Sequence, residues 1–396
     1  MSLANGRQYL AIPGPSVMPD RVLNAMHQAA PNIYEGELTD MVGGLRDDLK
    51  AVARTRQNVA IYIGNGHATW EAANANIFSR GDTAIVLATG RFGHGWAENA
   101  RQLGVKTAVT DFGKAAPIDP ERAEAALRAN PGARAVMITH MDTATSVRND
   151  VAMVRKLMDD LGHPGLLMVD CIASLACDQF EMDDWGVDVM IAASQKGLMT
   201  PPGLGFVFFS DKAKAAGKTS DLRSPYWDWT PRNEAEFFYE NWYGTAPTHH
   251  LFGLREALTM LHEEGIENVW ARHTKLASAV WAAADAWGTE GAFRLNVANP
   301  ENRGHSVTAA RLSGNDGTRL RNWTEFEAGV TLGIGLGMTE PGDPGADAFF
   351  RIAHMGHVNA HMTLGALAVM DTGMKVLGIP HGPGALDAAA AALASA

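Results

Sequence analysis

The stretches LLMVDCIASL, residues 166–175, and DVMIAASQKGLMTPPGLGFVFF, residues 188–209, decide the fold of this chain. Each contains an apolar run of strand length, which is typical of a strand buried on both faces. The first run ends abruptly at Asp170, and the second is followed by Lys196, a Pro-Pro-Gly turn and a further apolar run. We therefore expect neighbouring strands here, with Asp170 and Lys196 in the connections that leave them.

Three more short apolar runs precede these two stretches and alternate with helical patterns. Helical spacing follows the first run at residues 68–78 and, after a turn at 90–93, follows the second at 96–103. This alternation predicts an α/β fold with a mostly parallel sheet covered by helices, whose ligands lie at the carboxyl ends of the strands. The three runs are residues 59–63, 84–88 and 135–139.

The character of the sequence changes after about residue 212. An irregular segment rich in aromatic residues, 220–243, suggests either an interface or pocket wall, or a local hydrophobic cluster. A long helical pattern follows from 249 to 287, with a break at Gly265, and the rest of the chain reads as a smaller α+β unit. We expect an N-terminal segment, 1–20, a large domain, 21–262, and a small C-terminal domain, 263–396.

Composition excludes several classes of function. The formal net charge is −11, so an electrostatic grip on nucleic acid or on anionic lipid is not expected. The two cysteines, Cys171 and Cys177, form no CxxC pair, which excludes a disulfide framework and a zinc ribbon. No apolar stretch is long enough to span a membrane, and the N-terminus does not read as a signal peptide. We expect a cytoplasmic protein.

Asp170 and Lys196 form the pair with the clearest chemistry. A lysine in a connection between buried strands has a lowered pKa, because burial penalises its charged form. A neutral amine is the nucleophile that forms an imine with an aldehyde. A carboxylate on the neighbouring strand can hold a pyridine nitrogen protonated, and the ring then accepts electrons from a carbanion.

Five motifs in order along the chain resemble those of the class V aminotransferases, which use pyridoxal phosphate. Within that family the chain is most similar to the alanine–glyoxylate and serine–glyoxylate aminotransferase group. The resemblance covers nearly the whole chain and implies fold type I, with a seven-stranded, mostly parallel sheet in the large domain and a smaller α+β domain. The motifs are GNGHATWEAA (64–73), TGRFG (89–93), VDCIASL (169–175), SQKGLMTPPG (194–203) and FRIAHMG (350–356).

The resemblance also implies which residues hold the cofactor. Lys196 would form the internal aldimine and shuttle the proton between the substrate Cα and the cofactor, while Asp170 would pair with the pyridinium nitrogen. The strand–helix turn at 64–67 would bind the phosphate, although such turns also serve simply to reverse the chain. The remaining cofactor contacts implied are Asn65, Gly66, His67 and Gln195 to the phosphate, and Phe92, Thr143 and Ile172 to the ring.

Two further positions concern the substrate and the assembly. Arg351 matches the arginine that binds the substrate carboxylate, a task that suits the fork of a guanidinium. His354 is expected to line the pocket beside it. Thr245 matches a residue that reaches the phosphate of a partner subunit, which implies a homodimer with shared active sites. No metal and no nucleic acid are expected.

Several positions depart from the pattern of the family. Trp242 stands where a tyrosine is usual, although the neighbouring Tyr243 could replace its hydroxyl. Phe92 replaces a commoner tryptophan, Ala353 replaces a glycine, and the early His-Arg segment of many relatives is absent. These departures leave the identity of the amino donor open.

Rival constellations are weaker. His354, His357 and His361 have a spacing that could suggest a metal, but a Met-Gly pair interrupts the helical pattern. The run 333–337 resembles half of a dinucleotide fingerprint, which keeps a nicotinamide-dependent oxidoreductase as an alternative from another class. A desulfurase or lyase of the same family is the nearest competitor, but the chain has no cysteine after Cys177.

The sequence therefore predicts a pyridoxal-phosphate-dependent transaminase. It would move an amino group from a small L-amino acid, with serine or alanine favoured, to glyoxylate or another short 2-oxo acid by a ping-pong mechanism. A non-catalytic interaction protein would have no use for Asp170, Lys196 and Arg351 together.

Overall fold

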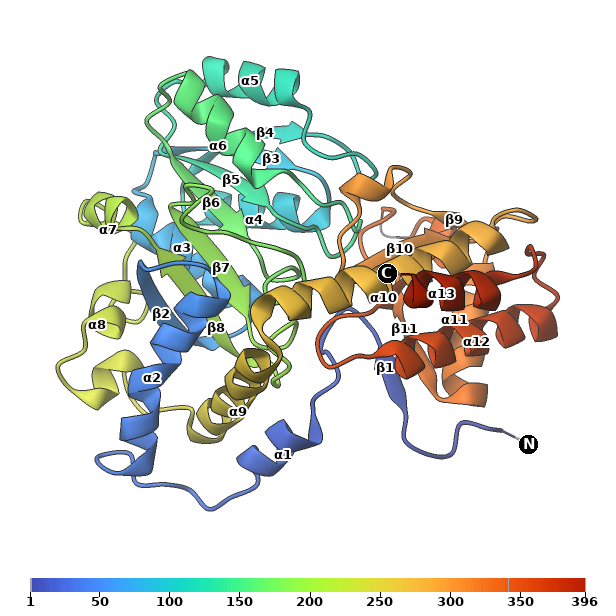
Figure 1. Ribbon diagram of the computed structural model, residues 1–396. Helices are drawn as coiled ribbons and strands as arrows, with labels where there is room; N and C mark the ends of the chain where they lie inside the picture. Colours follow the sequence, from blue (N-terminus) through green and yellow to red (C-terminus); the bar gives the residue numbers. More distant parts are fainter. Residues whose placement is uncertain (1, 341, 396) are drawn as a thin grey trace.

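The computed structural model describes residues 2–340 and 342–395. A seven-stranded sheet with the order β2-β8-β7-β6-β5-β3-β4 forms its larger part (Figure 1). Only β8 runs against the others, so the prediction of a mostly parallel sheet is confirmed. The strands are β2 (Asn58–Gly64), β3 (Thr83–Ala88), β4 (Lys106–Asp111), β5 (Ala135–Thr139), β6 (Leu166–Asp170), β7 (Val189–Ala193) and β8 (Gly203–Phe209).

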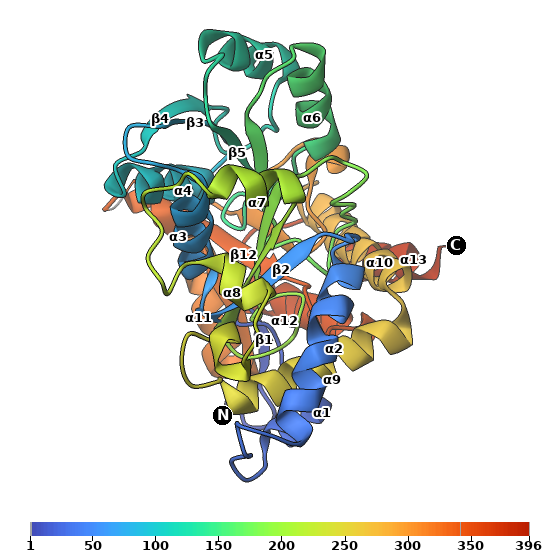
Figure 2. The ribbon, with the colours of Figure 1, turned by 90° about the vertical axis from the view of Figure 1, so that its left-hand side faces the viewer.

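Helices cover both faces of this sheet. Successive side chains of a strand point to opposite faces, so Val136 and Ile138 of β5 enter one hydrophobic cluster, while Ala135 and Met137 enter the other. This explains why the strands read as continuous apolar runs. One face carries α2 (Glu37–Val52), α5 (Pro120–Ala129), α6 (Val151–Asp160) and α9 (Thr248–Glu264); the other carries α3 (Gly66–Ile77), α4 (Arg91–Gln102) and α7 (Asp211–Gly217). Figure 2 shows α3 and α4 on one side of the strands and α2 on the other.

A second sheet of five strands has the order β1-β11-β12-β10-β9. Helices α10 to α13 pack on it around a separate hydrophobic cluster that includes Trp287, Phe293 and Phe350. Its strands are β1 (Tyr9–Ala11), β9 (Arg294–Leu295), β10 (Val307–Arg311), β11 (Val330–Ile334) and β12 (Phe349–Ala353). Its helices are α10 (Ile266–Trp287), α11 (Asp316–Ala328), α12 (Ala360–Leu377) and α13 (Ala385–Ala394).

The long helical pattern breaks at Gly265, where α9 gives way to α10. Gly265 has a φ of +81°, a conformation that glycine adopts without steric cost. Figure 1 shows α9 beside the large sheet and α10 running towards the small one. We propose the domain division near residue 262, with the addition that β1, in the N-terminal segment, pairs with β11 of the small sheet.

The aromatic segment serves two purposes. Trp229, in the short helix α8 (Trp229–Asn233), stacks on Phe209 of β8 with ring centroids 4.2 Å apart, so one part of the segment belongs to the core. Phe237, Tyr239 and Tyr243 are instead more than half exposed. The remaining short helices are α1 (Asp20–Met26), η1 (Phe238–Asn241), η2 (Pro300–Asn302) and η3 (Pro344–Ala348).

One local expectation differs from the structure. Residues 91–93, read as a turn, form the first turn of α4, so that helix begins five residues earlier than its apolar spacing indicates. The alanine-rich tail forms α13, which packs in the cluster of the small sheet through Ala385 and Ala389. No helix in the described part of the chain is both long and apolar enough to cross a membrane.

Candidate active site

A cavity of about 240 Å³ lies where the connections after β2, β3, β5, β6 and β7 meet. The strands β3, β5, β6 and β7 are parallel, so their carboxyl ends lie at one edge of the sheet, the edge at which α/β folds bind ligands. The sequence therefore brings together residues from five distant segments. The cavity is lined by Asn65, Gly66, His67, Trp70, Phe92, Thr143, Ile172, Gln195 and Lys196.

The turn between β2 and α3 presents the start of a helix to this cavity. Asn65 is the N-cap, and its Oδ1 accepts the backbone N–H groups of His67 and Ala68. A Cβ atom on Gly66 would lie 2.5 Å from Cδ1 of Ile172, so a larger residue here would displace the Ile172 side chain in the cavity wall. The positive end of the helix dipole favours an anion at this point.

Asp170 ends β6 as a buried carboxylate with two donors. Its Oδ2 accepts a hydrogen bond of 2.7 Å from Nε1 of Trp70, and its Oδ1 accepts one of 2.8 Å from the backbone N–H of Ile172. Burial raises the pKa of Asp170 to about 7, although both hydrogen bonds and the charge of Lys196 oppose the rise. A cation near Asp170 would offset the cost of burying its charge.

Lys196 lies in the connection between β7 and β8, and β7 pairs with β6, the strand that ends at Asp170. Burial lowers its pKa to about 8, and the positive charge of Arg351 contributes to the shift. The Nζ atom donates a hydrogen bond to the carbonyl of Pro13, and Lys196 has no ion-pair partner among the described residues. Compared with an exposed lysine, a much larger share of this amine is therefore neutral at physiological pH, and the neutral form is the one that acts as a nucleophile.

The remaining lining residues form the walls of the cavity. The ring of Phe92 lies near Trp70, with centroids 6.2 Å apart, and Ile172 follows Asp170. The buried Oε1 of Gln195 has no hydrogen-bond partner among the described residues. A buried polar atom without a partner is uncommon in folded proteins and indicates a group that a ligand can satisfy.

Arg351 reaches the site from the small sheet. It lies on β12 opposite Gly333 of β11, and its guanidinium donates from Nε to the carbonyl of Ile334 at 2.7 Å and from Nη1 to the carbonyl of Thr143 at 2.9 Å. Burial lowers the pKa of Arg351 to about 10, so the group stays protonated. Its Nη2 atom makes no hydrogen bond to the described residues, which leaves one edge of the fork for an acid.

Four predicted site residues do not line the cavity. Asp170 and Arg351 form hydrogen bonds to residues that line it, whereas His354 and Thr245 do not. Both ring nitrogens of His354 are engaged, Nε2 with Oγ1 of Thr308 at 2.9 Å and Nδ1 with the carbonyl of His305 at 2.8 Å. Burial lowers the pKa of His354 to about 4, so the ring is neutral and held in the interior at the end of β12. Thr245 is exposed and does not line the cavity within one chain.

Three features escaped the sequence analysis. Trp70 lies one helical turn after Gly66, so the 3.6-residue period of α3 could have placed both on one face. Asp142 is fully buried, but the sequence analysis identified only the next residue, Thr143, as a candidate site residue. The segment 13–16 packs against the Lys196 loop, where Oγ of Ser16 donates to the carbonyl of Lys196 at 2.7 Å.

These residues fit pyridoxal phosphate. The helix start at Gly66 and the unpartnered Gln195 suit a phosphate, the apolar walls suit a flat ring, and Asp170 suits a protonated ring nitrogen. Lys196 supplies an amine of lowered pKa for an aldehyde.

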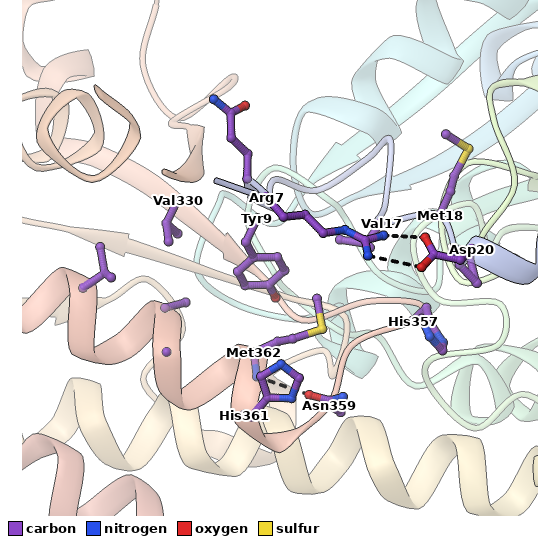
Figure 3. Close-up of a pocket in the computed structure, with 15 residues that line it drawn as sticks. Arg7, Tyr9, Val17, Met18, Asp20, Val330, His357, Asn359, His361 and Met362 are labelled. Carbon is purple, nitrogen blue, oxygen red and sulfur yellow. Dashed lines mark hydrogen bonds and ion pairs between the residues drawn. The ribbon is translucent and has the colours of Figure 1, made fainter. Parts of the chain in front are cut away.

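A second, larger cavity of about 540 Å³ lies between the N-terminal segment and the first turns of α12 (Figure 3). Arg7 and Asp20 form an ion pair at its edge, and His357 and His361 line it. The three histidines with metal-like spacing are therefore divided, because His354 is buried in the core. No group of three or more possible ligands is arranged for a metal in residues 2–340 and 342–395.

Solved structures share this fold along the whole chain. Pyridoxamine–pyruvate aminotransferase from Mesorhizobium loti superposes with a TM-score of 0.89 over 99% of both chains at 24% identity. Ureidoglycine–glyoxylate aminotransferase from Bacillus subtilis gives a TM-score of 0.88 over 100% of both chains at 21% identity. The predicted fold type I architecture is thus confirmed.

Other proteins share a higher sequence identity with this chain than these two solved structures do. A serine–glyoxylate aminotransferase from Methylorubrum extorquens is 36% identical over 94% of this chain and 93% of its own. An L-aspartate–glyoxylate aminotransferase from Paracoccus denitrificans is 35% identical over 93% of this chain and 91% of its own. The sequence profile of the family described as Aminotransferase class-V matches residues 8–322. The chain therefore belongs to the class V aminotransferases, enzymes that depend on pyridoxal phosphate.

Proposed function

We propose that this enzyme transfers the amino group of a small L-amino acid, with serine or alanine favoured, to glyoxylate or another short 2-oxo acid. The relatives named for serine–glyoxylate and aspartate–glyoxylate transfer support this choice of acceptor. The observation that carries the proposal is the buried amine of Lys196, with a pKa of about 8, in a cavity that also holds an anion-binding helix start. Transfer would run in two half-reactions, the donor leaving as a 2-oxo acid before the acceptor binds.

Each wall of the cavity has a role in holding the cofactor. Asn65, Gly66, His67 and Gln195 would hold the phosphate, and Asp170 the protonated ring nitrogen. Phe92, Thr143 and Ile172 would hold the ring and exclude water. When bound, pyridoxal phosphate supplies an aldehyde carbon for amines and a ring that takes up electrons from the substrate Cα.

The proton transfers fall to Lys196. Its Nζ is neutral in a large fraction of molecules near pH 8, so it can accept a proton from the Cα of a bound amino acid and return it in the other half-reaction. Arg351 would bind the substrate carboxylate with the Nη2 edge, because its Nε and Nη1 atoms are already held by carbonyl groups. Fixing the carboxylate orients the Cα–H bond towards the amine.

We also propose a homodimer in which Thr245 of one subunit reaches the phosphate of the other. Thr245 is exposed, and Phe237, Tyr239 and Tyr243 nearby in the sequence are exposed aromatic side chains of the kind enriched in interfaces. Trp242 is buried, so the phosphate contact usual for tyrosine at that position would fall to Tyr243.

The alternatives find less support. Cys171 and Cys177 are buried, and burial raises the pKa of Cys177 to about 12, so neither is the accessible thiolate that a desulfurase needs. The glycines at 333–337 lie at the end of β11, in a sheet where β11 and β12 are antiparallel, and no helix follows directly as a dinucleotide fingerprint requires.

A half-reaction screen tests the proposal. The purified holoenzyme is mixed with single amino acids, and conversion of the cofactor to its amino form is followed by absorbance. We expect serine or alanine to convert it, and glyoxylate to reverse the change. Loss of the cofactor spectrum without formation of a 2-oxo acid, or no conversion by any amino acid, would refute transamination.

A further inference from the structure

Asp142 is a buried carboxylate close to the candidate site. It belongs to none of the five family motifs and does not line the cavity. It lies in the turn after β5 and is fully inaccessible. Its Oδ2 accepts the backbone N–H of Phe92 at 2.8 Å, and its Oδ1 accepts the N–H groups of Ala144 at 2.9 Å and Thr145 at 3.3 Å. All three partners are donors, so the group acts only as an acceptor, which is the role of the ionised form. Burial raises the pKa of Asp142, and these backbone donors oppose the rise.

The first of these bonds caps α4 from outside the helix. The N-cap residue of α4 is Gly90, which has no side chain to accept the free N–H groups of the first turn. Asp142 supplies that acceptor from 52 positions further along the chain, and its charge also suits the positive end of the helix dipole. A Cβ atom on Gly90 would lie 2.6 Å from Cγ of Asp142, so glycine is required for the carboxylate to approach.

The capped turn and the turn that contains Asp142 carry two residues of the proposed site and contact a third. Phe92 is the residue whose N–H the carboxylate accepts, and Thr143 is the next residue in the chain. The carbonyl of Thr143 in turn accepts Nη1 of Arg351, and the charge of Asp142 stabilises the protonated guanidinium by raising the pKa of Arg351. One buried group thus connects the ring wall on the large domain to the carboxylate-binding arginine on the small domain.

We propose that Asp142 is a positioning residue that sets the distance and angle between the cofactor ring at Phe92 and the substrate carboxylate at Arg351. This inference rests on the proposed function, because it assumes that Phe92 and Arg351 face cofactor and substrate. In this proposal Asp142 contacts neither the cofactor nor the substrate. It acts through the backbone of Phe92 and Thr143.

The variant Asp142→Asn tests this, because it keeps the shape but removes the charge and turns one acceptor into a donor. We expect KM for both the amino acid and the 2-oxo acid to rise at least about tenfold, the effect of losing one charge-assisted hydrogen bond. The visible circular dichroism of the bound cofactor should also weaken, because the ring is held less firmly. Asp119→Asn is the matched control, since Asp119 caps α5 by the same chemistry through the N–H of Arg122, away from the site.

A merely structural role would lower the melting temperature in both variants and leave KM and the dichroism unchanged at a temperature where both are folded. That result for Asp142→Asn would overturn the proposal. If Asp142→Asn does not fold, the variant Gly90→Ala tests the proposal instead. It keeps the aspartate at position 142, but the added methyl group pushes the carboxylate away from the start of α4. The same rise in KM and loss of dichroism are expected, and wild-type values would overturn the proposal. Failure of the wild-type enzyme to transaminate would refute the proposed function instead.

Discussion

Trp70 donates a hydrogen bond of 2.7 Å from its indole Nε1 to Oδ2 of Asp170, in the interior of the site. This bond lowers the pKa of Asp170, against the effect of burial, and so keeps the carboxylate closer to its charged form. It also joins α3, which presents the anion-binding turn, to the end of β6, where the proposed partner of the ring nitrogen lies.

We predict that Trp70→Phe lowers kcat by about tenfold or more, because a buried carboxylate loses one of its two donors. The pKa of Asp170 should rise, and affinity for pyridoxal phosphate should fall. Steady-state kinetics and titration of the cofactor absorbance measure both effects. Trp287→Phe is the control, because Trp287 makes the same kind of bond to Asp371 in the small domain, at 2.9 Å. Equal kinetic effects of the two substitutions would contradict a specific role for the Trp70 bond.

Gly14 should be required for the Lys196 side chain to keep its position. A Cβ atom on Gly14 would lie 2.6 Å from Nζ of Lys196, and the residue has a φ of +94°. We predict that Gly14→Ala slows covalent capture of pyridoxal phosphate at least about tenfold, because the amine must move. Gly36→Ala is matched for backbone strain, since Gly36 has the same φ of +94° but open space around it. If both variants capture the cofactor at the wild-type rate, the close approach of Gly14 to Lys196 is not needed for capture.

Arg351→Lys should separate charge from geometry. Lysine keeps the positive charge but lacks the fork that binds both carboxylate oxygens. We predict that KM for amino acids and 2-oxo acids rises by about tenfold to a hundredfold, the range for a charge-assisted hydrogen bond. Affinity for pyridoxal phosphate, measured by quenching of tryptophan fluorescence, should stay at the wild-type value. An unchanged KM would show that the carboxylate is bound elsewhere.

The rate at which the cofactor-free protein captures pyridoxal phosphate should depend on the ionisation of Lys196. Burial lowers the pKa of this lysine to about 8, and only its neutral form attacks an aldehyde. Below pH 8 the observed rate should therefore fall about tenfold per pH unit, and above pH 8 it should level off. Stopped-flow absorbance between pH 6 and pH 10 measures this profile. A rate that keeps rising towards pH 10 would mean that the amine has the pKa of an exposed lysine.

The strands around the site could be predicted because they are buried on both faces. Residues of β5, β6 and β7 are all buried, so each strand reads as an unbroken apolar run. Strand β4 was missed for the opposite reason. It lies at the outer end of the sheet, and its sequence KTAVTD leaves most side chains partly or fully exposed.

The start of α4 could not be predicted from the local sequence, because it depends on a residue from a distant segment. Gly90 and Gly93 favour a turn by their own preferences, yet the helix begins at Arg91 because Asp142 caps it from a distant segment. His354 also shows that distant contacts decide where a side chain lies. Its place three residues after Arg351 suggested a pocket residue, but Thr308 and His305 engage both ring nitrogens within the core.

The assignment of Lys196 as the cofactor-binding amine is the central claim, and borohydride reduction followed by peptide mass spectrometry tests it most directly. The purified protein is loaded with pyridoxal phosphate, reduced and digested, and the labelled lysine is located. We predict a single phosphopyridoxyl group on Lys196, and none at this peptide in Lys196→Ala. A label on any other lysine at equal or greater yield, or no label after loading, would contradict the account.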